Sequence, residues 1–262
     1  MERGRQSRWI KIRGSDRAWP SGRPSLNILA IETSSEYCSV ALCAGDAVHS
    51  ESIRAGQSHS EKVLGMVATV LAAGGLRLAE CDAVAFGAGP GSFTGLRIAC
   101  AVAQGLAWGQ DLPVLPVGTL TAMAEQCRAE QPLAVPEGAS ILCMQDARMG
   151  EVYWSVLEWH HTGWRERLPA ALSRPGELLA MELPEIALGC GNAFGLFASE
   201  LLPQVAAVAG PLYPEARYVA LLGRRQYARG ERLAARRARP LYVRDQVALT
   251  TAERAAVRDL AS

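Results

Sequence analysis

Hydrophobic residues in the first half of the chain fall into short runs separated by polar turns. The runs at 26–34, 38–45 and 47–53 are short and separated by turn residues, which predicts three successive strands of a meander. Two further runs, 81–89 and 112–117, predict a buried strand and a partner strand.

Helical periodicity appears between these strands. The stretch 59–73 has Ser58 or Ser60 placed to cap its start and Gly74 placed to end it. A second helix is predicted for 93–108. The apolar face of the first helix consists of Val63, Val67, Val70 and Leu71.

The second half of the chain partly repeats this order. A β-rich start is again followed by α/β units, which predicts an α/β fold of two related domains, with mixed sheets flanked by helices and the second domain shortened. The predicted elements are a helix at 119–130, a hairpin of strands 140–147 and 151–159, a strand at 185–192, and helices at 193–202 and 216–229.

The predicted helix 93–108 is apolar on nearly all sides, with Arg97 and Gln104 as its strongly polar residues. A surface helix should show a polar face, so this one needs cover on two sides. Either the chain's own second domain covers it, or the helix forms a subunit interface.

Composition narrows the class of protein. The 262 residues are 49% hydrophobic and 20% charged with a net charge of +1, which predicts a folded globular chain without bulk attraction to nucleic acid or membrane. Seven scattered cysteines without a Cys-x-x-Cys pair predict buried, reduced thiols in the cytoplasm. Residues 1–25 form a basic extension, expected to be disordered, with nucleic-acid binding as the alternative.

The stretch "GAGPGSFTGLR" at 87–97 lies where many proteins hold a phosphate. It lacks the spacing and the lysine of a P-loop, and Thr94 stands where a dinucleotide fingerprint needs its third glycine. Backbone N–H groups at the helix start could still hold an anion. The four histidines have no metal-ligand spacing and there is no Gly-x-Ser-x-Gly elbow, so we assign neither a metal site nor a catalytic residue.

Two strand-end carboxylates and a run of arginines remain open to two interpretations. Glu32 and Asp146 could serve acid–base chemistry or accept bonds from nearby turn N–H groups. The arginines could form a solvated face or contact phosphates in RNA or a nucleotide. They are Arg217, Arg224, Arg225, Arg229, Arg232, Arg236, Arg237 and Arg239.

Five motifs together carry a family resemblance. "LAIETSSEYCSVAL", "HSEKVL", "GAGPGSFTGLRIACAVAQGLAWG", "MQDARMGEVYW" and "RPLYVRDQ" occur in order between residues 26 and 247, and this part of the chain resembles the TsaB (YeaZ) family. The resemblance implies two actin/hexokinase/Hsp70-like (ribonuclease H-like) domains. Their expected bounds are 26–118 and 119–247, with a tail at 248–262.

The resemblance also implies a function in tRNA modification. The family serves the pathway that adds threonylcarbamoyl to the adenosine beside the anticodon, as the scaffold of the catalytic paralogue TsaD and the ATPase TsaE, while TsaC supplies the threonylcarbamoyl-adenylate. The metal-binding histidines of TsaD correspond here to Thr119 and Met123, and Glu32-Thr33-Ser34-Ser35 replaces the Asp-x-Gly-Thr phosphate motif. These replacements fit a non-catalytic subunit. The alternative is an autonomous small-molecule kinase or peptidase.

The expected partners follow from this resemblance. They are a TsaD-type subunit, a TsaE-type ATPase, tRNA through the complex, and a second copy when the chain is alone. We assign no cofactor to the chain by itself and consider ATP or ADP at the partner interface, contacted by Glu32, Ser92, Thr94 and Arg97. The predicted partner interface consists of His59, Val63, Val67, Val70, Gly95, Leu96, Ala99, Ala103 and Leu106.

Overall fold

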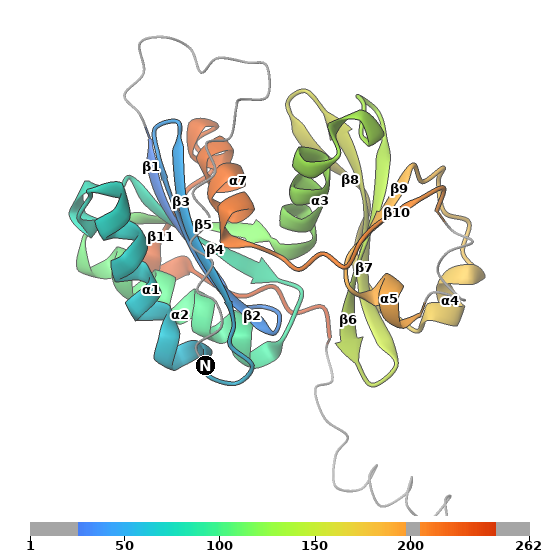
Figure 1. Ribbon diagram of the computed structural model, residues 1–262, viewed down its shortest axis with the longest axis horizontal. Coiled ribbons are helices and arrows are strands. Elements are labelled where there is room, and N and C mark those ends of the chain that lie inside the picture. Colours follow the sequence, from blue (N-terminus) through green and yellow to red (C-terminus); the bar gives the residue numbers. More distant parts are fainter. Residues whose placement is uncertain (1–25, 198–204, 245–262) are drawn as a thin grey trace, which may run out of the picture.

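The computed structural model describes residues 26–197 and 205–244 (Figure 1). The expectations for residues 1–25 and 248–262 lie outside this part of the chain. None of the described helices is long and apolar enough to span a bilayer. All seven cysteines are buried and free, as the sequence predicts.

The first lobe is built on a six-stranded mixed sheet with the order β11-β5-β4-β1-β2-β3. β1 pairs antiparallel with β2 and parallel with β4, so a crossover helix must connect the meander to the parallel strands. The strands are β1 Asn27–Glu32, β2 Tyr37–Ala44, β3 Ala47–Arg54, β4 Ala83–Gly89, β5 Pro113–Gly118 and β11 Leu233–Ala234.

Helices cover both faces of this sheet. α1 (His59–Gly74) and α2 (Phe93–Gly109) pack on one face, and α7 (Ala216–Ala228) packs on the other (Figure 1). Alternate residues of β1 therefore enter two different cores: Leu29 and Ile31 face α1 and α2, whereas Ile28 and Ala30 face α7.

The second lobe has a five-stranded sheet with the order β10-β9-β6-β7-β8. α3 packs on the face that looks toward α7, and α5 lies on the opposite face. The elements are α3 Thr119–Glu130, β6 Ser140–Arg148, β7 Glu151–His160, β8 Gly163–Ser173, α4 Pro175–Leu179, β9 Leu188–Cys190, α5 Ala193–Leu196 and β10 Val208–Ala209. Short 3₁₀ helices lie at Leu78–Glu80, Pro132–Ala134 and Ala235–Arg237.

The two sheets share one topology, which confirms the predicted duplication. In each lobe a three-stranded antiparallel meander is followed by two parallel strands added beside its first strand. The second copy is shortened, because β9 and β10 have three and two residues where β4 and β5 have seven and six.

The lobes do not divide the chain at a single point, which differs from the predicted domain bounds. α7 packs on the first sheet and β11 pairs with β5 of that sheet, although both follow the second lobe in sequence. Strand β8 was not predicted. At the end of α1 the left-handed cap is Gly75 (φ +66°), not Gly74.

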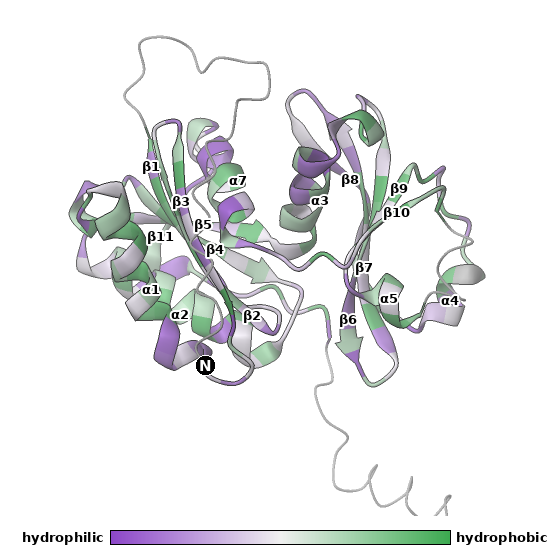
Figure 2. Ribbon diagram, viewed as in Figure 1, coloured by the Kyte–Doolittle hydropathy of each residue, from purple (hydrophilic) through white to green (hydrophobic). Residues whose placement is uncertain are grey.

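Helices α3 and α7 meet at the seam between the lobes around one buried carboxylate. Glu125 of α3 accepts hydrogen bonds from Arg128 (2.8 Å) and from Arg225 of α7 (2.8 Å). Trp164 Nε1 of β8 donates to the same carboxylate at 2.9 Å. Figure 2 shows hydrophilic segments of both helices at this seam. The seam therefore depends on charge pairing as well as on apolar packing.

Candidate functional site

The glycine loop packs against the first turn of the chain and leaves no open phosphate cradle. A Cβ at Gly91 would lie 2.6 Å from Cβ of Ser34, and a Cβ at Gly95 would overlap the carbonyl oxygen of Thr33. Two hydrogen bonds hold the contact: Ser92 N donates to Ser34 O at 2.7 Å, and Thr33 Oγ1 donates to Gly95 O at 2.7 Å. The glycines thus allow close backbone packing, and the residues present do not fit a nucleotide phosphate at this turn.

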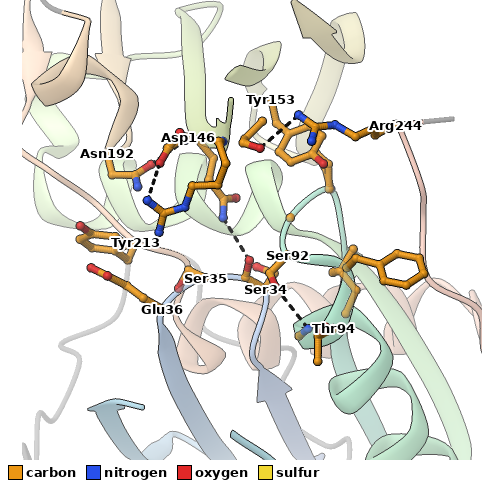
Figure 3. Close-up of a pocket in the computed structure, with 18 of the residues that line it drawn as sticks. Ser34, Ser35, Glu36, Ser92, Thr94, Asp146, Tyr153, Asn192, Tyr213 and Arg244 are labelled. Carbon is orange, nitrogen blue, oxygen red and sulfur yellow. Dashed lines mark hydrogen bonds and ion pairs between the residues drawn. The ribbon is translucent and has the colours of Figure 1, made fainter. Parts of the chain in front are cut away.

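A cleft of about 1050 Å³ opens between the lobes beside this loop, and we call it the first cleft (Figure 3). Ser34 and Ser92 line one side of it, and Asp146, Asn192 and Arg244 line the other. Gln145 Nε2 donates to Ser34 O at 3.3 Å, which joins the lobes at the floor of the cleft.

The four predicted ligand contacts differ in their access to the first cleft. Ser92 and Thr94 line it at the start of α2. Arg97 is turned to the C-terminal segment, where its guanidinium lies 3.9 Å over the Phe93 ring and Nε donates to Tyr242 Oη at 3.1 Å. Glu32 is fully buried beneath the floor. Two of the four residues are therefore placed to touch a ligand in this cleft.

Both strand-end carboxylates are held by local turns. Glu32 Oε1 accepts a bond from Ser34 N at 2.5 Å, and burial raises the pKa of the Glu32 carboxyl despite this bond. Asp146 Oδ1 accepts from Arg148 N at 2.8 Å, and Asp146 N donates to Asn192 Oδ1 at 2.9 Å. These contacts match the turn interpretation of both residues.

Thr119 and Met123, which stand where TsaD has its metal-binding histidines, have structural contacts in this chain. Thr119 Oγ1 accepts a hydrogen bond from Gly89 N at 3.1 Å, and Met123 is fully buried in the second-lobe core. Among the described residues, no group of three or more His, Cys, Asp or Glu side chains is arranged to hold a metal ion.

The predicted partner interface needs correction. Val63, Val67 and Val70 of α1 are buried against the chain's own sheet, and so are Leu96, Ala99 and Ala103 of α2. These residues lie on the apolar stripe of each helix that packs on the sheet. Two more predicted residues are occupied within the chain, since His59 bonds to Ser35 O at 3.0 Å and Gly95 abuts Thr33. Leu106 is half-buried against the same core, and its place in a partner interface stays a prediction.

A different apolar surface faces outward on α1 and α2. We call it the outer helical face. Leu64 is 55% exposed and Trp108 is 67% exposed, and a Cβ at Gly105 would meet no atom within 4 Å. The exposed residues that define the face are Leu64, Ala68, Ala72, Ala101, Gly105 and Trp108. α2 thus has a second apolar side without cover from the described chain.

Residues 240–244, which we call the C-terminal strap, connect the two lobes beside the first cleft. Leu241 N donates to Ala88 O at 2.6 Å, and Tyr242 packs on Phe93 with ring centroids 5.3 Å apart. Arg244 reaches the second lobe, where it pairs with Glu151. Sequence reasoning used this segment only as a family motif and missed its role as a connection.

We predict that Arg244→Gln lowers the free energy of unfolding by about 1.5 kcal/mol, because the ion pair to Glu151 and the hydrogen bond to Ala147 O are partly buried. Urea unfolding measures this loss. The matched control is Arg54→Gln, whose pair with Glu36 involves a side chain that is 70% exposed and should change stability by less than about 0.5 kcal/mol. Equal effects of the two substitutions would contradict a bridging role for Arg244.

Comparisons with known proteins agree with the fold. The family model described as TsaD, tRNA N6-adenosine threonylcarbamoyltransferase, matches residues 51–195. The tRNA threonylcarbamoyladenosine biosynthesis protein TsaB of Haemophilus influenzae is 33% identical over 85% of this chain and 95% of its own length. The TsaB protein of Escherichia coli is 33% identical over 85% of this chain and 96% of its own length. The solved structure of YeaZ from Pseudomonas aeruginosa superposes with a TM-score of 0.74 at 33% identity, covering 83% of this chain and 99% of that one.

Proposed function

The chain belongs to the TsaB family of tRNA threonylcarbamoyladenosine biosynthesis proteins, and on that premise we propose that it acts in this pathway as a non-catalytic subunit. It would serve as the scaffold of a TsaD-type catalytic subunit, joined by a TsaE-type ATPase, with tRNA engaged through the complex. The buried thiols suit a reduced compartment, and we place the protein in the cytoplasm.

The outer helical face is the observation that carries the scaffold proposal. Ala101 and Gly105 are small and exposed, so another helix could approach α2 closely, and Trp108 offers a large anchor beside them. The same face would form a homodimer when the partner is absent. This assignment replaces the buried residues that the sequence had favoured.

The non-catalytic part of the proposal is supported by how the candidate chemical groups are used. Thr119 and Met123 are structural, and Glu32 and Asp146 serve turns. We propose that ATP or ADP binds only in the complex with the partner, where Ser92 and Thr94 are accessible from the first cleft, and not to this chain alone. Turnover of Mg-ATP by the isolated chain would favour the alternative of an autonomous kinase.

We expect Ala101→Glu and Gly105→Glu each to weaken binding of the TsaD-type subunit at least about tenfold, because a charge would enter an apolar contact. Isothermal titration with that subunit measures the effect, and reconstituted tRNA modification should fall in parallel. Both positions are exposed, so thermal stability should stay close to that of the wild type.

Ala228→Glu is the matched control, since it places the same charge at an exposed alanine of α7. It should bind the partner like the wild type. If Ala101→Glu and Gly105→Glu also bind normally, the outer helical face is not the interface. If reconstituted modification does not require the chain, the scaffold role itself fails.

A further inference from the structure

A second cleft of about 990 Å³ lies between the lobes and shares only Leu241 with the first cleft. The end of α7, the turn between β7 and β8, and the segment before the C-terminal strap form its walls. Of the stretch 87–97 only Ala88 lines it, and the first turn of the chain does not contribute to it. Its chemistry therefore needs an explanation of its own.

The lining of the second cleft is positively charged. Four arginines face two glutamates there, and Glu231 is already committed to Arg229 through bonds of 2.7 and 3.0 Å. Arg165 lies opposite Glu158 of β7 and helps to lower the pKa of that carboxylate, whereas Arg239 is exposed in the segment that leads into the C-terminal strap. The residues concerned are Arg165, Arg225, Arg229 and Arg239 against Glu166 and Glu231. Such a surplus of guanidinium groups attracts phosphate.

Behind the cleft wall, one carboxylate forms ion pairs with two guanidinium groups. Glu125 pairs with both Arg128 and Arg225, which leaves one positive charge uncompensated. Nη1 of Arg225 is buried without a hydrogen-bond partner among the described residues. A buried donor in this state destabilises the fold unless a ligand or water accepts a hydrogen bond from it, and a phosphate oxygen is a suitable acceptor.

Gln226 also lines the second cleft and has an acceptor without a partner among the described residues. Gln226 donates its Nε2 to Pro116 O at 3.1 Å, while its Oε1 is buried and lacks a partner among the described residues. A bare anion would leave that oxygen unsatisfied. A ribose 2′-hydroxyl could donate to it, because that group both donates and accepts.

The positive charge continues outside the cleft. Arg232 is exposed and stacks on Tyr227 of α7 at 4.2 Å, next to the cleft residues Arg229 and Glu231. Arg236 and Arg237 are exposed too, but their 3₁₀ helix packs on α2, on the other face of the sheet. Arg232 thus extends the positive charge beyond the cleft on the α7 side, which fits a ligand with more than one phosphate.

We propose that the second cleft, with Arg232 beside it, binds the ribose-phosphate backbone of an RNA strand. This inference rests on the proposed function, in which the RNA is the tRNA substrate. The cleft holds one phosphate and its ribose, and Arg232 contacts a neighbouring phosphate. The chain then contributes to substrate binding on a surface separate from the outer helical face.

The test uses the full-length chain and an unmodified tRNA transcript in fluorescence anisotropy over a series of salt concentrations. Arg239→Gln should weaken binding roughly three- to tenfold and lower the salt-dependence slope by about 1. Arg225→Lys keeps a positive charge beside Glu125 but loses the guanidinium fork, so it should weaken binding with little change of slope. Arg77→Gln, which removes an 82% exposed arginine elsewhere, should bind like the wild type.

Two results would overturn the inference. The first is tRNA binding that is absent in the wild type at low salt or equal in all variants. The second combines two measurements: inorganic phosphate stabilises the wild type but not Arg225→Lys, while both proteins bind tRNA equally. That result would indicate a site for a small anion. Reconstituted tRNA modification distinguishes a failure of the RNA site from a failure of the proposed function. If the chain supports modification and its variants still bind tRNA normally, only the RNA site is contradicted.

Discussion

Gly95→Val is expected to lower the free energy of unfolding by about 3 kcal/mol or more and to prevent folding at physiological temperature. A Cβ at this position would overlap the carbonyl oxygen of Thr33 and lie 3.4 Å from Cα of Ser34. Both contacts are with backbone, so no side-chain rotation can relieve them. The first turn of α2 would have to move away from β1, breaking the bond from Thr33 Oγ1 to Gly95 O.

Gly105→Ala on the same helix provides the control. A Cβ there meets no atom within 4 Å, and alanine is the better helix former, so stability should stay the same or rise by about 0.5–1 kcal/mol. Chemical unfolding monitored by circular dichroism measures both variants. If Gly95→Val proves as harmless as Gly105→Ala, the glycine at 95 does not serve close packing, and the loop would instead be a candidate for ligand binding.

The contrast between these two glycines shows where sequence reasoning reached its limit at the candidate site. Spacing alone excluded the two standard nucleotide motifs in residues 87–97. It could not show that Gly91 and Gly95 exist to let Ser34 and Thr33 approach, because those contacts join segments about 60 residues apart. A glycine looks the same in a sequence whether a phosphate or a carbonyl lies beside it.

Most elements could be predicted because their periodicity is local. α3 has the predicted bounds, and the other main helices agree within one residue. β8 was missed because its sequence "GWRERLPAALS" combines consecutive charges with a proline and has no clean alternation. Its strand structure comes from pairing with β7, which the local sequence does not specify.

The return of α7 and β11 to the first sheet could not be predicted for a similar reason. These elements follow the second lobe in sequence, and only the tertiary contacts of α7 with β1 and β2, and of β11 with β5, place them. The division of the chain at residue 118 assumed contiguous domains. Because α7 returns to the first lobe, it meets α3 of the second lobe and forms the seam between them.

The two apolar sides of α2 could likewise not be told apart from the sequence alone. The sequence correctly indicates that α2 needs cover on two sides, since it is apolar nearly all round. With two apolar stripes, periodicity cannot say which one packs on the chain's own sheet. The structure assigns the stripe with Ala99 and Ala103 to the core and leaves Ala101, Gly105 and Trp108 outside.

Glu125→Gln is expected to lower the free energy of unfolding by about 3 kcal/mol near pH 7. Removing one partner of a buried ion pair leaves guanidinium charges without compensation, and the loss falls at the low end of the usual range because Arg225 is 30% exposed. Trp164 would also lose a charged acceptor for its N–H. Urea unfolding as a function of pH measures the effect, and Glu61→Gln on the exposed side of α1 is the matched control, expected within about 0.5 kcal/mol.

The pH dependence of this stability difference tests whether charge pairing of Glu125 is its cause. Burial alone would raise the pKa of Glu125, but the guanidiniums of Arg225 and Arg128 outweigh it and lower the pKa below its usual value of 4.5. A carboxyl with a lower pKa in the folded chain stabilises the fold above the unfolded pKa, and this contribution is lost as pH falls through the folded pKa. The gap between wild type and Glu125→Gln should thus be constant near neutrality and shrink below about pH 4.5. A gap that persists undiminished in acid would contradict charge pairing as the force that joins α3 to α7, and with it the origin of the uncompensated arginine in the second cleft.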